Sequence, residues 1–427
     1  MSINNATDLI IRTNFEPIPM KSAIFSLAFL IASASVDAQK SVATLQFENL
    51  PDQGHSFPVQ FSLNKSIAQD AQLVLIEVRG KKKVTIPVQS HQDGPQRNYT
   101  FLLSPAPFKG KRNFQLVQQP LSPSVAKMRA EKKSGDLLVS SNGKNLLQYR
   151  YETLFPPAGV DTVFKRSAFI HPLWSPQGQV LTRIQPPDHY HHYGIWNPWT
   201  HILFDGDTVD LWNLNRKHGT VRFAGFKAIE EGPVFSSYSS LHEHVVFKKE
   251  GEQVIMNEVQ TVTVYQPEAN AYIVDINIEM TCATTKPVTL LEYRYAGLGW
   301  RTTEQWDNQN SSVLTSEGSS RKNADGSRAK WCLVQGTVDG VNAGVVMMSS
   351  PANYNHPEPL RIWPENQYKR GDMFANFNPT KDRDWVIEPG KTYSLTYRLL
   401  VFNGDFDKEM SEAAWKNFAN TPVFTIK

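Results

Sequence analysis

The sequence has only two cysteines, Cys282 and Cys332, among its 427 residues. Two thiols are too few for a thiolate metal cage or a disulfide-rich scaffold, and they allow at most one disulfide. No apolar run reaches the roughly 18 residues that a helix needs to cross a bilayer, which argues against integral membrane association. The 44 basic and 41 acidic residues leave a net charge of +3, too balanced to indicate a nucleic-acid partner.

Motifs of several enzyme classes are missing as well. The sequence has no phosphate-binding loop, no dinucleotide fingerprint and no G-x-S-x-G nucleophile elbow. No repeat of about 20–50 residues appears, which disfavours a propeller. Aromatic residues, in contrast, make up 11% of the chain and include ten tryptophans. Their rings bury large areas and also form surfaces that bind sugars.

Residues 1–38 are expected to be a leader with a signal peptide. Lys21 follows an internal Met20, an apolar core spans residues 23–32, and Val36-Asp37-Ala38 forms an A-x-A-like cleavage pattern. This pattern is typical of a secretory signal peptide whose translation starts at Met20. We therefore expect a periplasmic or secreted protein, in which a disulfide between the two cysteines is permitted but not indicated.

The rest of the sequence indicates an all-β fold. Residues 41–118 alternate short apolar runs with Pro, Gly and Asn, which predicts a small immunoglobulin-like β-sandwich. Residues 119–135 are polar and basic and are interpreted as a linker. Residues 136–427 carry all ten tryptophans and long strand-like alternation, so they predict a large antiparallel sandwich or barrel. Helical spacing appears only in residues 407–418.

Six of the eleven histidines and four of the ten tryptophans lie between His171 and His218. The core of this segment runs from Pro186-Pro187 through Asp188-His189-Tyr190-His191-His192 to Gly194. In an extended strand, His189 and His191 would share one face and His192 would lie on the other. Imidazole transfers protons near neutral pH and also binds metals.

Three interpretations of the histidine-rich segment stay open. His189 and His191 could bind a divalent metal, with Asp188 or His356 completing the site. Alternatively, the imidazoles could act as acid and base on a sugar bound against neighbouring tryptophans. In the third interpretation the segment is a structural loop of hydrogen-bonded histidines and packed aromatic rings.

Three further segments carry side chains suited to a hydroxyl-rich or anionic ligand: residues 209–221, 291–301 and 349–357. The first contains Asp210 and Asn213, which could equally be turn residues. If the second is a strand, Glu292 and Arg294 share one face, either as a wall of the site or as an exposed structural pair. In the third, His356 lies between Asn and Pro on an expected turn.

These segments together resemble a bacterial family labelled methane oxygenase PmoA-like, whose domain has no assigned function. The resemblance covers residues 135–404 and rests on Asp188-His189-x-His191-His192-x-Gly194, on Asp210-x-Trp212-Asn213-Leu214, and on Asn353 through His356-Pro357. Tyr190 and Tyr193 stand where many members have Pro and often Arg, which puts an anion contact at the second position in doubt. The label implies a methane-oxidising membrane subunit, which the absence of long apolar runs contradicts. The resemblance instead implies exported β-sandwich proteins of glycan-degrading bacteria.

More distantly, residues 136–427 resemble the galactose-mutarotase-like supersandwich. That resemblance implies a large antiparallel β-supersandwich, a fold that hosts aldose epimerases, polysaccharide lyases and glycoside hydrolases. Fold alone is a weak guide to function.

We therefore predict an exported carbohydrate-active enzyme, a lyase, epimerase or hydrolase, that acts on a glycan or sugar through a histidine-rich site. The alternatives are a non-catalytic glycan-binding protein and a metal-dependent hydrolase or oxygenase. A glycosidase with two facing carboxylates ranks lower, because the histidine segment has only one adjacent carboxylate.

The predicted catalytic residues are His191 or His192 as general acid and Glu292 as base. The predicted substrate-binding residues are Asp188, His189, Trp196, Trp212, Asn213, Arg294, Arg301, Asn353 and His356. A divalent metal is the one cofactor considered, with His189, His191 and His356 as candidate ligands.

Overall fold

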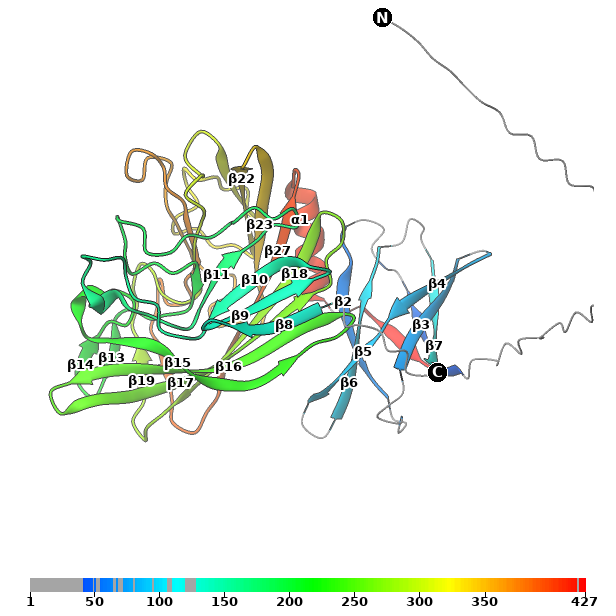
Figure 1. The fold of residues 1–427 in the computed structure, drawn as a ribbon, viewed down its shortest axis with the longest axis horizontal. Helices are drawn as coiled ribbons and strands as arrows, with labels where there is room; N and C mark the ends of the chain where they lie inside the picture. Colours follow the sequence, from blue (N-terminus) through cyan, green and yellow to red (C-terminus); the bar gives the residue numbers. More distant parts are fainter. Residues whose placement is uncertain are drawn as a thin grey trace, which may run out of the picture. The chain divides into compact units, whose positions relative to one another are not determined.

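The computed structural model describes residues 41–48, 50, 54–63, 67, 72–79, 81–93, 96–105, 110–119, 128–420 and 422–427. Antiparallel β-strands make up almost all of their regular structure, with one α-helix, α1 (Lys408–Ala419) (Figure 1). Among these residues no helix is both long and apolar enough to span a membrane. The predicted leader lies outside the described residues. The all-β sandwich class expected from the sequence is confirmed.

The first part of the chain forms a small sandwich of two sheets. A five-stranded sheet has the order β28-β1-β7-β3-β4, and a three-stranded sheet has the order β2-β6-β5. The strands are β1 (Ser41–Phe47), β2 (Phe57–Ser62), β3 (Gln72–Arg79), β4 (Lys82–Pro87), β5 (Gln89–Asp93), β6 (Gln96–Leu103), β7 (Arg112–Gln119) and β28 (Phe424–Ile426). Phe47 and Phe114 of one sheet pack against Phe101 of the other, with ring centroids 6.2 and 6.1 Å from that of Phe101.

The second part contains two eight-stranded sheets, of which the first has the order β24-β25-β20-β12-β11-β10-β9-β8. Its strands are β8 (Met128–Lys133), β9 (Asp136–Ser141), β10 (Lys144–Arg150), β11 (Phe169–Leu173), β12 (Ile195–Trp196), β20 (Gly299–Arg301), β24 (Leu360–Ile362) and β25 (Phe374–Phe377). Strand β8 falls in the stretch interpreted as a linker, and its backbone pairs with β9. Residues 120–127 of that stretch lie outside the described residues.

The other eight-stranded sheet has the order β15-β16-β17-β18-β27-β23-β22-β21. Its strands are β15 (Gly219–Glu230), β16 (Phe235–Lys248), β17 (Gly251–Tyr265), β18 (Ala271–Cys282), β21 (Ser311–Thr315), β22 (Trp331–Val338), β23 (Val341–Ser349) and β27 (Tyr393–Asn403). In β18 the buried Ile276, Ile278 and Met280 alternate with the more exposed Asn277 and Glu279, as period-2 patterning requires.

A four-stranded sheet of short strands has the order β14-β13-β19-β26. The strands are β13 (Ile202–Phe204), β14 (Asp207–Val209), β19 (Val288–Leu290) and β26 (Trp385–Ile387), and two 3-10 turns are η1 (Thr162–Phe164) and η2 (Leu214–Arg216). Strand β19 ends at Leu290, and residues 291–298 have no strand hydrogen bonding. The prediction of a strand around Glu292 is therefore wrong.

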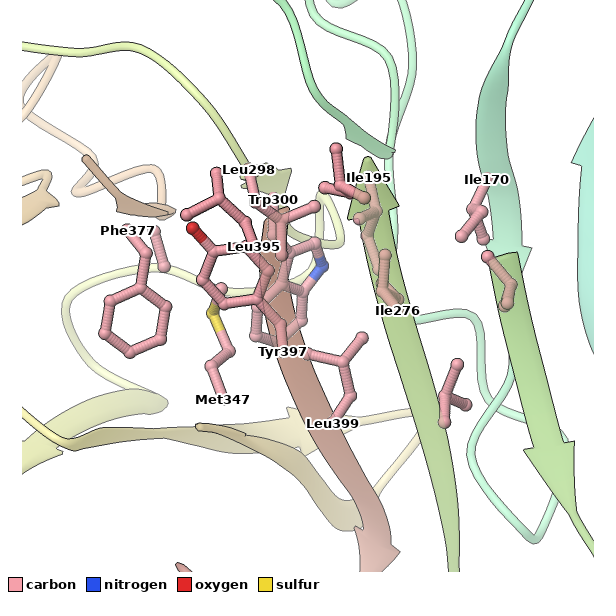
Figure 2. Packing of buried hydrophobic residues seen from close by; sticks show 14 of the residues in the cluster. Ile170, Ile195, Ile276, Leu298, Trp300, Met347, Phe377, Leu395, Tyr397 and Leu399 are labelled. Atoms are coloured by element: carbon pink, nitrogen blue, oxygen red, sulfur yellow. The ribbon is translucent and has the colours of Figure 1, made fainter. Parts of the chain in front are cut away.

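One large hydrophobic core fills the space between the two eight-stranded sheets. Ile195 and Trp300 of the first sheet point toward Ile276 and Leu399 of the second (Figure 2). All four side chains are at most 3% exposed. Buried residues of β12 and β20 belong to this core, and the histidine-rich turn directly precedes β12.

A second core is shared between the small sandwich and the second eight-stranded sheet. It contains Leu45 and Phe101 of the sandwich together with Trp331, Leu400 and Phe402 of the larger sheet. Helix α1 lies within one residue of its expected bounds. The carboxylate of Asp407 caps the helix by accepting a hydrogen bond from the backbone N–H of Met410 at 2.8 Å.

The two cysteines are free thiols, Cys332 buried and Cys282 partly buried. Burial raises the pKa of Cys332 to about 12, which makes it a poor nucleophile. Neither thiol bears on the site described next.

Candidate functional site

A cleft of about 640 Å³ lies where four segments of the second part meet. These segments are the histidine turn before β12, the region around η2, the irregular stretch after β19 and the β24–β25 hairpin. Its lining combines three histidines, six other aromatic residues, three arginines and three side-chain amides. Among the described residues, no carboxylate lines the cleft.

Residues 185–194 form a tight turn that gathers the three histidines. The backbone N–H of Gln185 donates to the carbonyl of His192 at 2.8 Å, and that of His192 donates to the carbonyl of His189 at 3.0 Å. Gly194 ends the turn with φ at +54°, and a Cβ there would lie 2.1 Å from the backbone oxygen of Ile170. Only glycine meets both demands, because it lacks a Cβ.

This turn brings together side chains that an extended strand would separate. The ring centroids of His189, His191 and His192 lie 4.6–5.2 Å apart. One ring nitrogen from each histidine lies within 4.8 Å of the other two. The expectation that His192 faces away from His189 and His191 is therefore wrong, since it assumed a strand where the chain turns.

The three rings differ in their surroundings. Burial, with the charges of His189 and Arg166, lowers the pKa of His191 to about 3. Burial likewise lowers the pKa of His192 well below its ordinary value, and its Nδ1 is buried without a hydrogen-bond partner. Both rings are therefore neutral at neutral pH. A neutral imidazole accepts a proton or binds a metal, whereas a general acid must donate a proton.

His189 is oriented by a carboxylate and an arginine beneath it. Its Nδ1 lies 3.0 Å from Oδ2 of Asp188, and Nη2 of Arg301 donates to the same oxygen at 2.9 Å. Burial opposes ionisation of Asp188, but the hydrogen bond from His189 and the charge of Arg301 prevail and lower its pKa to about 2. Arg301 is 1% exposed and does not line the cleft, so it positions Asp188 instead of contacting a ligand.

Aromatic rings surround the imidazoles. Trp212, Trp363 and Phe374 line the cleft, and the ring centroid of His192 lies 5.2 Å from that of Phe374 and 5.6 Å from that of Trp363. Trp196 is 1% exposed and packs behind Trp212, with centroids 5.0 Å apart. Of the two tryptophans expected to form a sugar platform, Trp212 therefore reaches the cleft, and Trp196 supports it from the core.

The segment around η2 contributes Asn213 to the cleft. The buried carboxylate of Asp210 accepts hydrogen bonds from the backbone N–H groups of Trp212 and Asn213, at 2.9 and 2.8 Å. Oδ1 of Asn213 in turn accepts from the hydroxyl of Tyr295 at 3.1 Å. Asp210 is thus the turn residue that the sequence left as an alternative, and it holds Asn213 at the wall of the cleft.

Three guanidinium groups line the cleft, of which Arg216 is paired with Asp210 at 3.5 Å and Arg361 with Asp325 at 2.5 Å. Arg216, Arg294 and Arg361 line it from three different segments. The guanidinium of Arg294 lies 5.4 Å from the ring centroid of Tyr295 and 5.7 Å from that of Tyr293, which is within cation–π range.

Glu292 does not share this placement. Its side chain is exposed and does not line the cleft, and its backbone N–H donates to Asp384 at 2.6 Å. The alternation expected to put it beside Arg294 is absent, because residues 291–298 form no strand. The position of Glu292 therefore argues against a role as base.

Asn353 and His356 belong to a different, buried cluster. Nδ2 of Asn353 donates to Oε1 of Glu358 at 2.8 Å, and Nδ1 of His356 lies 3.2 Å from the hydroxyl of Ser349. The ring of His356 stacks over Trp415, and neither it nor Asn353 lines the cleft. Both were predicted to bind substrate, but they instead stabilise a loop. The predicted metal ligands were His189, His191 and His356. In the structure, the third histidine close to His189 and His191 is His192, not His356.

Several cleft residues were not anticipated from the sequence. Trp363 and Tyr368 come from the β24–β25 hairpin, and Tyr368 places its hydroxyl 3.3 Å from Nε2 of His189. A local signal exists in the mixed aromatic and polar run from Arg361 to Tyr368, but only the sheet order brings it beside the histidine turn.

Residues 136–416 match a family whose description reads "Family of unknown function (DUF6807)". The chain belongs to the DUF6807 family. The match contains all the residues that line the cleft, so the site lies within the part of the chain that defines membership. The DUF6807 description names no activity and no methane oxygenase, and the resemblance to a family with that label stays a prediction.

Solved structures also match this DUF6807 protein. One of them is the crystal structure of an alpha-mannosidase from Enterococcus faecalis V583, with a TM-score of 0.40 and 10% sequence identity. The similarity covers 90% of this chain and 45% of the mannosidase chain, so the chain spans less than half of that protein. No curated protein matches the chain.

Proposed function

We propose that this DUF6807 protein is an exported enzyme that binds an acidic saccharide in the cleft and acts on it at the three histidines. The observation that carries the proposal is the meeting of aromatic rings, guanidinium groups and neutral imidazoles in one cleft without a lining carboxylate. A cleft of about 640 Å³ is in the size range of small-ligand sites.

The aromatic and amide residues supply what a sugar ring requires. Tyr368 offers an exposed aromatic ring, against which the C–H face of a pyranose packs, whereas Trp212 and Trp363 are 1% and 5% exposed and reach the cleft only with small parts of their rings. Asn213 and Gln367 offer side-chain amides, each of which both donates and accepts hydrogen bonds with hydroxyl groups. These features support a saccharide as the ligand.

The arginines favour a saccharide that carries a carboxylate. Guanidinium groups bind carboxylates through two parallel hydrogen bonds, and they retain their charge at any physiological pH. Arg294 and Arg216 are both exposed beside the cleft, and Arg216 is also paired with Asp210 at 3.5 Å, which leaves Arg294 as the better placed of the two to bind a ligand. Because the described residues that line the cleft include arginines and no carboxylate, a uronic acid fits the charge of the cleft better than a neutral sugar does.

The chemistry we propose is proton abstraction from the carbon next to the sugar carboxylate. An imidazole of the histidine cluster would take this proton, and the released electron pair then expels the oxygen at the β-carbon, which leaves as a hydroxyl group after taking a proton from water, so that an unsaturated uronate remains. Alternatively, the carbon takes a proton from water on its other face, which gives an epimer. The arginines would stabilise the negative charge that develops on the carboxylate. A glycosidase mechanism needs two carboxylates that flank the scissile bond. It is disfavoured here, since no carboxylate of the described residues lines the cleft.

Export is part of the same proposal. The signal-peptide pattern ending at Ala38 supports a periplasmic or secreted enzyme, where polymeric saccharides are accessible. N-terminal sequencing of protein recovered from the periplasm or medium of an expressing bacterium should find Gln39 as the first residue. Recovery of uncleaved protein in the cytoplasm alone would contradict export.

A panel of uronate-containing and neutral polysaccharides tests the function. We expect a uronate polymer to be bound and to acquire the ultraviolet absorbance of an unsaturated uronate, or the proton NMR signals of its C5 epimer. Arg294→Ala should weaken uronate binding by at least about tenfold, the value of one lost charged hydrogen bond. Arg183→Ala is the matched control, because Arg183 does not line the cleft and pairs with Glu304 outside it.

Two results would overturn the proposal. Equal affinity for neutral and uronate polymers would contradict the proposal that the substrate is acidic. Binding of a uronate polymer without any conversion would show a glycan-binding protein instead of an enzyme.

A further inference from the structure

We infer that His189, His191 and His192 bind one divalent transition-metal ion of the zinc type, with an open coordination position that faces the cleft. The inference rests on the geometry of the three histidines and does not require the proposed substrate. If both hold, the ion is the group that contacts the saccharide.

The three ring nitrogens are close enough to share an ion. They lie within 4.8 Å of one another, and all three belong to one turn of four residues. Nitrogens bound to zinc at about 2.0–2.1 Å stand roughly 3.4 Å apart in a tetrahedral site. Moving each ring nitrogen about 1 Å inward would reach this spacing.

His192 points to a missing partner in this cluster. Its side chain is 3% exposed, and Nδ1 is buried without a hydrogen-bond partner among the described residues. A buried unsatisfied polar atom costs on the order of 1–3 kcal/mol, so such atoms normally have a partner. Coordination of an ion through Nδ1 would supply one.

His189 already has the hydrogen bonding of a metal ligand. Metal-bound imidazoles usually donate their second ring N–H to a carboxylate, which sets the tautomer and the ring orientation. Asp188 accepts at 3.0 Å from Nδ1 of His189 and is itself held by Arg301. This leaves Nε2 as the nitrogen for the ion, which would replace the long 3.3 Å contact from the hydroxyl of Tyr368.

The donor set selects the class of metal and its use. Three imidazoles and no carboxylate favour zinc, copper, nickel, cobalt or iron over the oxygen-seeking calcium and magnesium. Three protein ligands with a vacant fourth position are typical of catalytic zinc sites, whereas structural sites have four. The vacant position would hold water or an oxygen of the ligand and polarise it.

Metal content of tag-free protein tests the inference. We expect the full-length mature protein, reconstituted with zinc and dialysed against metal-free buffer, to retain one equivalent of zinc by elemental analysis. Cobalt in place of zinc should give the visible absorption of a four- or five-coordinate site. His191→Ala should lose the bound ion and this absorption, and His189→Ala provides a second variant should His191→Ala not fold.

His356→Ala is the matched control. His356 is also a partly buried histidine, and its Nδ1 lies 3.2 Å from the hydroxyl of Ser349. It is not part of the three-histidine cluster. This variant should keep one equivalent of zinc. Asp188→Asn should keep the site but weaken zinc affinity about 10–100-fold, as loss of an orienting carboxylate does.

The outcomes separate this inference from the proposed function. Parent protein that binds no zinc, copper, nickel, cobalt or iron in stoichiometric amount overturns the metal site, even if a uronate polymer is converted. Retention of the ion by both histidine variants overturns it too. One equivalent of metal in a protein that ignores every saccharide supports the metal site and defeats the proposed function alone.

Discussion

Glu358 is a single buried side chain that makes the stability of this protein depend on pH. It is 0% exposed and accepts hydrogen bonds from Ser349 at 2.6 Å, Asn353 at 2.8 Å and Tyr397 at 2.9 Å. Burial outweighs these hydrogen bonds and raises the pKa of Glu358 from its ordinary value of 4.5 to about 7. The folded state therefore favours the protonated carboxyl, which the unfolded chain does not.

We expect the Glu358 contribution to stability to be complete below about pH 4.5 and to fall as the pH rises to about 7. In that interval the unfolded chain releases the proton and the folded protein retains it. The difference amounts to about 3 kcal/mol in the free energy of unfolding. Glu358→Gln should remove this dependence, so urea unfolding of parent and variant at pH 5 and pH 8 should diverge. His356 and Tyr397 are titratable neighbours that are present in both proteins. Their contributions to the pH dependence therefore cancel when the parent and the variant are compared. Parallel profiles would contradict the prediction.

Arg301 is the residue on which the orientation of the histidine turn depends. Its side chain is 1% exposed and binds Asp188 at 2.9 Å, with Asp372 at 3.6 Å. Arg301→Gln should lower the free energy of unfolding by about 2 kcal/mol, because Asp188 loses a hydrogen bond from a charged donor.

Arg183→Gln should change stability by less than about 1 kcal/mol, since its partner Glu304 is 69% exposed and water screens the pair. Thermal unfolding of the two variants side by side is the measurement. Equal effects would show that Arg301 is not the anchor of Asp188.

Among the elements, the histidine turn depends most on one residue. Gly194 combines a positive φ with a Cβ position 2.1 Å from the backbone oxygen of Ile170. Gly194→Ala should therefore destabilise the protein by about 3 kcal/mol or more, since it adds a backbone clash to the strain of the left-handed region.

Gly206, in the β13–β14 turn, separates the two effects. Its φ is +89°, and a Cβ there would meet nothing within 4 Å. Gly206→Ala should cost only about 1 kcal/mol, the strain alone. Denaturant unfolding measures both, and similar losses for the two variants would mean that the turn can shift to admit a side chain.

The same turn shows what the sequence could and could not predict. The density of histidine and tryptophan is a local property, so the sequence singled out a segment whose three histidines line the cleft. The orientation of His192 was not, because alternation assumes an extended chain and ignores the hydrogen bond from Gln185 to His192. Trp363 and Tyr368 were missed because their approach depends on the order of strands in a sheet, which no local pattern encodes.

At the scale of the whole molecule, one hydrophobic core is shared by the small sandwich and the second eight-stranded sheet, which the sequence analysis assigned to two separate domains. The described residues from Ser41 onward belong to one compact unit, and the core includes Phe101 of the small sandwich and Phe402 of β27. The change in composition along the sequence shows that all ten tryptophans lie in the second part. It does not reveal that apolar residues of the two parts pack together. The boundary at residue 118 stays a prediction.

We expect the two parts to unfold together. Phe402→Ala should lower the free energy of unfolding by about 3–5 kcal/mol, because the buried ring also stacks on Phe406 with centroids 4.2 Å apart. Calorimetry should show one transition that moves as a whole, and amide hydrogen exchange should speed up in β1 and β6 as well as in β27. Two transitions, of which one stays in place, would contradict this.

Strand β28 has a consequence for the order in which the protein is made. It pairs with β1, and the backbone N–H of Lys427 donates to the carbonyl of Thr44 at 3.0 Å. Domains that fold during synthesis generally do so from the N-terminal end onward. Here the sheet that contains β1 also contains β28, so this sheet is completed only after β28 has been synthesised. Until then, the backbone groups of β1 that pair with β28 in the folded protein are an open sheet edge, which is available for pairing with another chain.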